Sequence, residues 1–203
     1  MKIIDHNNVV ALDIKTSIWE QIFTVAPLVV IGSKEKTGYD LAPKHMATPI
    51  GFGNYFGFVC TPKHATYNNI KKNQEFTVSF PLPNHIIFTS LSATSRQLEI
   101  SKSKQIIDIL PTFKAPNIDA LFTENSYLYL ECTLFKIIDG FDENSIITGK
   151  ITSAFANNNY LKYFEEDEQG QIKNNPLLVY IAPGRFARIT ETYNFPFPKN
   201  FKR

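Results

Sequence analysis

The chain has 203 residues, of which 43% are hydrophobic and 20% are charged, and its formal net charge is +2. This composition is sufficient to bury a sizeable core, so it excludes a disordered chain, and the length fits one domain spanning residues 1–203. The near-neutral charge argues against a nucleic-acid-binding protein, and no run approaches the roughly 20 apolar residues of a membrane-spanning helix.

The first segment of the chain predicts an intracellular protein whose fold starts with a short helix. Residues 1–8 are too polar for a signal peptide, so we expect a cytoplasmic location with Cys60 and Cys132 reduced and buried as small hydrophobic residues. Ser17 and Glu20 have the spacing of a capping box, and Pro27 would close the helix that they begin.

Strand patterns dominate the next part of the chain. The apolar run 28–31 predicts a buried strand, followed by a turn over residues 32–38. Residues 45–52 predict a strand that Pro49 and Gly51 interrupt, which is typical of a sheet edge or of close approach by another group. A further strand over residues 55–61, a short helix over 66–72 and a strand over 75–80 follow.

The second half of the chain repeats this alternation of long strands and short helices. Residues 126–137 alternate apolar and polar side chains with a period of two, which predicts a half-buried antiparallel strand. Further elements are expected as helices at 86–93, 105–110 and 158–168, and as strands at 145–155 and 177–181. At least six strands, several of them at hairpin spacing, predict a mainly β fold, an antiparallel barrel with short decorating helices.

The segment after the 55–61 strand has the chemistry of an anion site. A helix that begins near Thr66 presents unpaired N–H groups and the positive end of its dipole, and Lys63 adds a charge. The same pattern also describes an ordinary capped helix with a nearby lysine. The residues alone leave both interpretations open.

Three segments together resemble the flavin reductase-like family of FMN-binding split barrels. They are A-P-K-H-M-A-T-P at 42–49, G-F-V-C-T-P-K-H-A-T-Y-N-N-I at 57–70 and E-F-T-V-S-F-P at 75–81, and V-Y-I-A-P-G-R-F at 179–186 extends the similarity. The resemblance covers roughly residues 17–198. It implies a six-stranded Greek-key split barrel that pairs as a homodimer and binds FMN.

The resemblance also implies where the flavin lies. Backbone N–H groups at Met46, Ala47 and Thr48, beside Lys44 and His45, would serve the pyrimidine edge of the flavin ring. The phosphate would lie against Thr61, Lys63, His64, Ala65 and Thr66, and Arg185 would contact the flavin or a nicotinamide substrate. Asp40 departs from the family, which often has asparagine there, and this puts the side-chain part of flavin recognition in question.

The expected activity is that of an oxidoreductase that moves a hydride from NADH or NADPH to the flavin, and then to free flavin or another acceptor. No catalytic side chain is assigned, because the flavin supplies the reactive atoms. The sequence has no P-loop, no G-x-G-x-x-G after a strand, no C-x-x-C and no metal-ligand pattern. Two alternatives stay open: an FMN-binding electron carrier similar to flavoredoxin, and a non-catalytic ligand-binding barrel.

Overall fold

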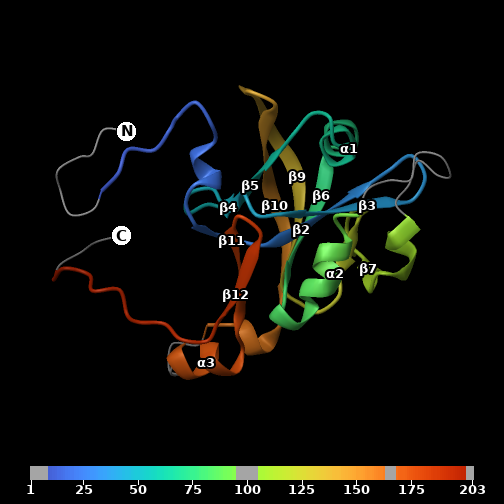
Figure 1. Ribbon diagram of the computed structural model, residues 1–203. Coiled ribbons are helices and arrows are strands. Elements are labelled where there is room, and N and C mark those ends of the chain that lie inside the picture. Colours follow the sequence, from blue (N-terminus) through green and yellow to red (C-terminus); the bar gives the residue numbers. More distant parts are fainter. Residues whose placement is uncertain (1–8, 95–104, 163–167, 200–203) are drawn as a thin grey trace.

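The computed structural model describes residues 9–94, 105–162 and 168–199, and its centre is a curled antiparallel sheet (Figure 1). Seven strands form this sheet in the order β3-β2-β6-β9-β10-β5-β4. In chain order they are β2 (Val29–Lys34), β3 (Tyr39–Lys44), β4 (Ala47–Pro49), β5 (Tyr55–Cys60), β6 (Glu75–Pro81), β9 (Ser126–Phe141) and β10 (Asn144–Ala156).

Two small sheets and several short helices surround the main sheet. One sheet contains β1 (Thr24–Pro27), β11 (Leu177–Ala182) and β12 (Arg185–Ile189), and the other pairs β7 (Thr112–Lys114) with β8 (Leu121–Thr123). The α-helices are α1 (Ala65–Asn73), α2 (Ile86–Leu91) and α3 (Glu168–Asn174), and 3₁₀ turns occupy Ile18–Glu20, Pro83–His85, Gln105–Ile109 and Asn158–Tyr160. The expected mainly β split-barrel class is confirmed, with seven strands in the main sheet instead of six. No described helix has the length and apolar character needed to cross a membrane.

The two edges of the main sheet meet at one short connection. Strands β3 and β4 lie at opposite edges, yet only His45 and Met46 separate them along the chain. Seven flat strands would put their edges about 29 Å apart, whereas three peptide steps reach at most about 11 Å. The sheet must therefore curl until its edges meet, and we call residues 44–47 the seam.

The curl encloses a core that is rich in phenylalanine. Phe56, Phe58 and Phe76 are each at most 1% exposed, and the rings of Phe58 and Phe76 pack edge to face with 5.5 Å between centroids. Burying one such side chain contributes about 1.5–3 kcal/mol. Gly149 makes room for them, since a Cβ there would lie 2.5 Å from Cζ of Phe76. A substitution at Gly149 would force these rings apart.

The structure corrects the expected turn at residues 32–38. Strand β2 continues to Lys34, and residues 39–44 form strand β3, which the sequence did not predict. Gly32 is a point of close packing within β2, since a Cβ there would lie 2.2 Å from the carbonyl oxygen of Leu121. Pro43 is accommodated in β3 because an edge strand does not need every N–H for pairing.

Other element boundaries also differ from those expected. Ser17 makes no side-chain cap, and a single 3₁₀ turn precedes strand β1, where a helix closed by Pro27 was expected. The interrupted strand 45–52 shrinks to β4, Ala47–Pro49. The helix expected at 158–168 is a 3₁₀ turn at its start, and α3 begins at Glu168; residues 163–167 lie outside the described part of the chain.

Strand β9 shows why a two-residue period does not identify a solvent-facing side. Leu130 and Cys132 face the core as expected, but Glu131 on the opposite face is also 0% exposed. The carboxylate of Glu131 accepts hydrogen bonds from the backbone N–H and the side-chain amide of Asn117, at 2.9 and 2.7 Å. A loop that precedes β8 therefore covers this face and supplies the polar partners that a buried carboxylate requires.

Candidate functional site

The residues expected to bind a ligand lie on the two sides of strand β3 next to the seam. Successive side chains of a strand point to opposite faces. Lys44 approaches the Cys60 thiol and Asp40 contacts Thr66 in the first turn of α1, while Pro43 and His45 line a pocket beside α2. We call these the α1 side and the pocket side.

On the α1 side, the first turn of α1 has the features of an anion site. His64 occupies the N-cap position with an extended backbone, and its side chain makes no cap hydrogen bond. The first turn contains no acidic residue. The N–H groups of Ala65 and Thr66 have no acceptor within the described ranges, as expected for the first positions of a helix. These two N–H groups are available to a ligand.

The Thr66 hydroxyl has a partner within the protein. Thr66 is 2% exposed, and its Oγ1 donates to Oδ2 of Asp40 at 2.7 Å. A hydroxyl has one proton to donate, so in this arrangement Thr66 offers a ligand its backbone N–H and no side-chain proton. Its expected hydroxyl contact to a phosphate stays a prediction. Asp40, itself 2% exposed, ties strand β3 to α1.

Lys63 lies at the surface of the same turn. Its Nζ is 2.9 Å from Oε1 of Glu143, and the two side chains are 72% and 75% exposed. Such a surface ion pair contributes little stability, so the ammonium group is able to exchange Glu143 for another anion. The Thr61 hydroxyl accepts from the backbone N–H of Lys63 at 3.4 Å, and the Thr61 carbonyl accepts from that of His64 at 3.0 Å. Residues 61–64 therefore form one hydrogen-bonded turn, and α1 begins directly after it at Ala65.

Both cysteines are free and buried, as expected. Burial raises the pKa of Cys60, and the hydrogen bond and positive charge of Lys44 oppose this shift without reversing it. This nearby cation was not anticipated from the sequence. Burial raises the pKa of Cys132 to about 12. Both thiols therefore stay protonated near neutral pH, so neither is a ready nucleophile.

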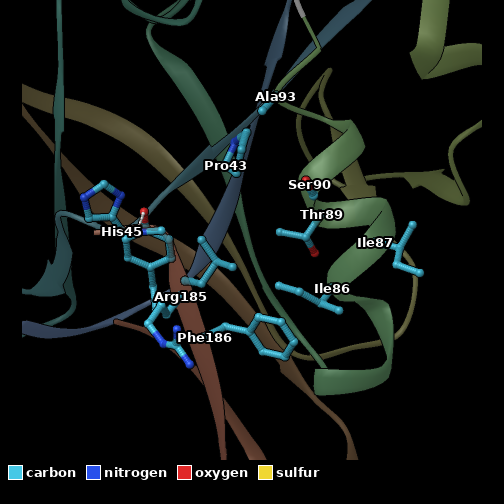
Figure 2. A pocket seen from close by; sticks show the side chains of 12 residues that line it. Pro43, His45, Ile86, Ile87, Thr89, Ser90, Ala93, Arg185 and Phe186 are labelled. Atoms are coloured by element: carbon cyan, nitrogen blue, oxygen red, sulfur yellow. Dashed lines mark hydrogen bonds between the residues drawn. The ribbon is translucent and has the colours of Figure 1, made fainter. Parts of the chain in front are cut away.

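On the pocket side, a largely apolar cavity of about 490 Å³ lies between α2 and the β11–β12 hairpin (Figure 2). In Figure 2, α2 forms one wall, and His45, Arg185 and Phe186 lie across from it. The lining residues are Leu28, Pro43, His45, Ile86, Ile87, Thr89, Ser90, Ala93, Tyr180, Gly184, Arg185 and Phe186.

Tyr180 joins the hairpin to the seam. Its ring stacks on the imidazole of His45 with 4.4 Å between centroids, and its hydroxyl accepts from the backbone N–H of Gly184 at 2.8 Å. Gly184 has a φ of +74°, a conformation that suits glycine, and Arg185 follows it as the first residue of β12. One aromatic side chain thus fixes the position of Arg185 relative to the seam.

His45 is neutral near pH 7. Burial lowers its pKa, and the positive charge of Lys44 lowers it further. The imidazole therefore presents the pocket with an uncharged ring whose two nitrogens include one donor and one acceptor.

The remaining expected contacts at the seam are backbone contacts. Met46 is 51% exposed, and its carbonyl accepts from the N–H of Val59 at 2.8 Å. The Ala47 side chain packs in the core, 6% exposed, and the Thr48 hydroxyl bonds to the adjacent carbonyl of Pro49 at 3.2 Å. The expected contacts of the Met46, Ala47 and Thr48 N–H groups to a flavin stay a prediction.

The sequence did not identify most of the pocket. Thr89 and Ser90 of α2 were expected only as part of a helix, and Tyr180 and Phe186 only as part of a motif. The pocket appears only when α2 and the β11–β12 hairpin pack beside the seam. Among the described residues no group of three or more His, Cys, Asp or Glu is placed to hold a metal ion.

Solved structures share this fold. A flavoredoxin from Methanosarcina acetivorans is 18% identical, with a TM-score of 0.74 over 95% of this chain and 97% of that chain. An FMN-binding protein from Thermus thermophilus with bound 1-cyclohex-2-enone is 16% identical, with a TM-score of 0.71 over 93% and 99%. A 2-nitrobenzoate 2-nitroreductase from Pseudomonas fluorescens is 17% identical, with a TM-score of 0.73 over 92% and 91%.

A search of curated proteins finds no match. The model of the flavin reductase like domain matches residues 23–184, which include the seam, the first turn of α1 and the whole main sheet and end just before Arg185. This chain belongs to the flavin reductase-like family.

Proposed function

We propose that the chain binds FMN at the seam and passes a hydride from NADH or NADPH to the flavin. One observation carries the proposal. The seam, where the two sheet edges meet, lies between an anion-ready helix start and an apolar pocket large enough for a ring system. FMN would place its phosphate at the helix start and its ring against the seam, and the pocket beside the seam would receive the molecule that exchanges a hydride with the ring.

The residues present fit FMN on the α1 side through backbone groups. The N–H groups of Ala65 and Thr66 would receive the phosphate, with Lys63 as the nearest exposed cation. The flavin, when bound, supplies the atom that accepts and releases the hydride. The protein's own part is to hold the phosphate, to orient the ring by backbone contacts at the seam, and to exclude water through the apolar walls of the pocket.

No residue of the site needs to act as an acid for this step. Cys60 lies near the α1 side. Burial raises its pKa, so the thiol keeps its proton and takes no part in the hydride step. His45 is neutral and able to donate or accept one hydrogen bond in the pocket. We assign both residues to positioning. The cytoplasm, where both pyridine nucleotides are available, is the expected setting.

We further propose a homodimer. Four large apolar side chains before and after the seam in the sequence are exposed to solvent. They are Trp19 at 56%, Phe23 at 68%, Val25 at 68% and Phe52 at 100%. Apolar surface of this kind is typical of interaction sites. Light scattering should give a mass near twice 23.1 kDa, and a monomer at micromolar concentration would contradict this part of the proposal.

A second function has its own support. The similarity to flavoredoxin, at a TM-score of 0.74, favours an electron carrier that binds FMN without a pyridine-nucleotide site. A barrel that binds a ligand without catalysis is the third alternative. It would yield a colourless protein with no affinity for FMN.

Anaerobic mixing of the FMN-loaded protein with NADH or NADPH separates these functions. A reductase should lose its flavin absorbance within seconds to minutes with at least one of the two donors. A carrier should keep its absorbance with both donors but lose it with dithionite. A protein that binds no FMN in the preceding titration would refute both flavin functions.

A further inference from the structure

The pocket beside α2 contains a cation that nothing in the described protein neutralises. Arg185 lines the pocket and forms no ion pair within residues 9–94, 105–162 and 168–199. None of the described residues that line the pocket is acidic. Arg185 is therefore available to an anion that comes from outside the chain.

The surroundings of Arg185 are mostly apolar. Leu28, Pro43, Ile86 and Phe186 contribute hydrocarbon walls. Among the polar lining groups, Thr89 already donates its hydroxyl proton to the carbonyl of His85 at 3.1 Å. What remains for a ligand is one guanidinium at an apolar cavity, together with a few uncharged groups.

Two of these uncharged groups lie at opposite walls. The Ser90 hydroxyl on α2 has no hydrogen-bond partner within the described residues, and the imidazole of His45 stands across the pocket (Figure 2). Both are able to bond a neutral polar substituent. Neither adds positive charge.

The size of the pocket fits a substituted ring. A cavity of about 150 Å³ is sufficient for benzene, and ligand pockets typically measure roughly 300–1,000 Å³. At about 490 Å³ this pocket holds a ring with substituents and leaves space beside the seam. The stacked pair of His45 and Tyr180 gives it one flat aromatic wall.

We propose that the pocket binds a planar ring compound carrying a single carboxylate, with the carboxylate held by Arg185 and the ring packed between α2 and the β11–β12 hairpin. A guanidinium matches a carboxylate through two parallel hydrogen bonds. A phosphate dianion fits less well, because the described residues of the lining supply one cation. That this ligand exchanges electrons with the flavin rests on the proposed function. That it binds in the pocket does not depend on the proposed function.

Fluorine NMR with two isosteric probes, 4-fluorobenzoate and 4-fluorobenzamide, tests the charge preference directly. The purified protein should bind the carboxylate at least tenfold more tightly than the amide. Arg185→Gln should reduce this ratio to about one while the amide affinity stays the same. Arg188→Gln, on the same strand but outside the pocket lining, is the matched control and should keep the tenfold ratio.

Equal binding of both probes, or loss of the preference in Arg188→Gln as well, would overturn the proposal. Nicotinamide mononucleotide that binds more tightly than 4-fluorobenzoate, with this advantage lost in Arg185→Gln, would assign Arg185 to a nucleotide phosphate and would also overturn it. FMN that displaces the probe would place the flavin ring itself in the pocket, which contradicts the proposal equally.

A flavin-fluorescence titration of the same samples separates this proposal from the function proposed above. Absence of flavin binding with an intact carboxylate preference would refute the flavin function alone. Flavin binding without a carboxylate preference would refute only the pocket ligand. Arg185 is exposed, so Arg185→Gln should fold normally, and a thermal melt that matches the parent protein checks this.

Discussion

The two sides of strand β3 differ in how their polar groups are used. On the α1 side, Asp40 and Thr66 are each 2% exposed and bond to one another. On the pocket side, Arg185 is exposed and makes no ion pair with any described residue. Buried polar groups need internal partners, whereas an exposed cation is solvated and remains free for a ligand. Substitution of the buried Asp40–Thr66 pair should therefore change folding stability, and substitution of an exposed cation such as Arg185 should change ligand binding.

The largest effect is expected at Asp40. Asp40→Leu leaves the buried Thr66 hydroxyl without its acceptor, which should lower the free energy of unfolding by about 1–3 kcal/mol. Urea unfolding measures this. Adding Thr66→Val to Asp40→Leu should recover part of the loss, because the unpaired hydroxyl is then gone. Arg185→Gln should stay within about 0.5 kcal/mol of the parent protein, and an equal loss in both would abolish the distinction between the two sides.

A smaller effect is expected at Lys63, and it concerns the ligand. Lys63→Ala should weaken the binding of FMN about three- to tenfold and leave the binding of riboflavin unchanged, because only FMN carries the phosphate. The Lys63 side chain is exposed, so the effect should be smaller than that of losing a buried charged hydrogen bond. Fluorescence titration with both flavins measures it.

Two further variants sharpen the test at Lys63. Glu143→Gln frees the ammonium group and should strengthen FMN binding. Lys72→Ala, at the other end of α1, should have no effect on either flavin. Parallel weakening of FMN and riboflavin in Lys63→Ala would show that Lys63 does not meet the phosphate.

The smallest effect is a pH dependence from His45. The folded protein lowers the pKa of His45 below its ordinary value of 6.5, chiefly through burial. Below about pH 6.5 the unfolded chain therefore binds more protons at this residue than the folded chain. The free energy of unfolding should fall as the pH is lowered from 7 toward the folded-state pKa of His45.

The slope of that pH dependence identifies the residue. His45→Phe keeps an aromatic ring against Tyr180 but cannot take up a proton, so its unfolding free energy should depend less on pH between 7 and 5. Burial lowers the pKa of His85 also, so part of the slope should remain in this variant. A slope identical to that of the parent protein would show that His45 does not contribute to the pH dependence of stability.

The elements that could be predicted from the sequence are those whose signal is local. The apolar run at β5, the helix at α1 and the alternating pattern of β9 were anticipated close to their observed bounds, because hydrophobic periodicity reports the local backbone. The seam segment stood out through its motif. The sequence did not show that this segment joins the two edges of the sheet, because that depends on which strands become the edges.

Long-range packing decided the features that were missed. Gly32 suggested a turn, but its lack of a side chain serves close contact with Leu121, far along the chain. Glu131 suggested a solvent-facing position, but a loop carrying Asn117 covers it. In both cases the determining neighbour is remote in sequence, so no local pattern carries the information.

The sequence by itself determined that this is a mainly β protein of the flavin reductase-like family with an anion-ready turn after β5. Only the tertiary structure decided that Thr66 donates its hydroxyl to Asp40, that Lys44 reaches Cys60, and that a pocket lined by Arg185 lies across β3. The physical reason is that strand alternation sends neighbouring residues to opposite faces of a sheet. What each residue then meets depends on elements that pack there from elsewhere in the chain.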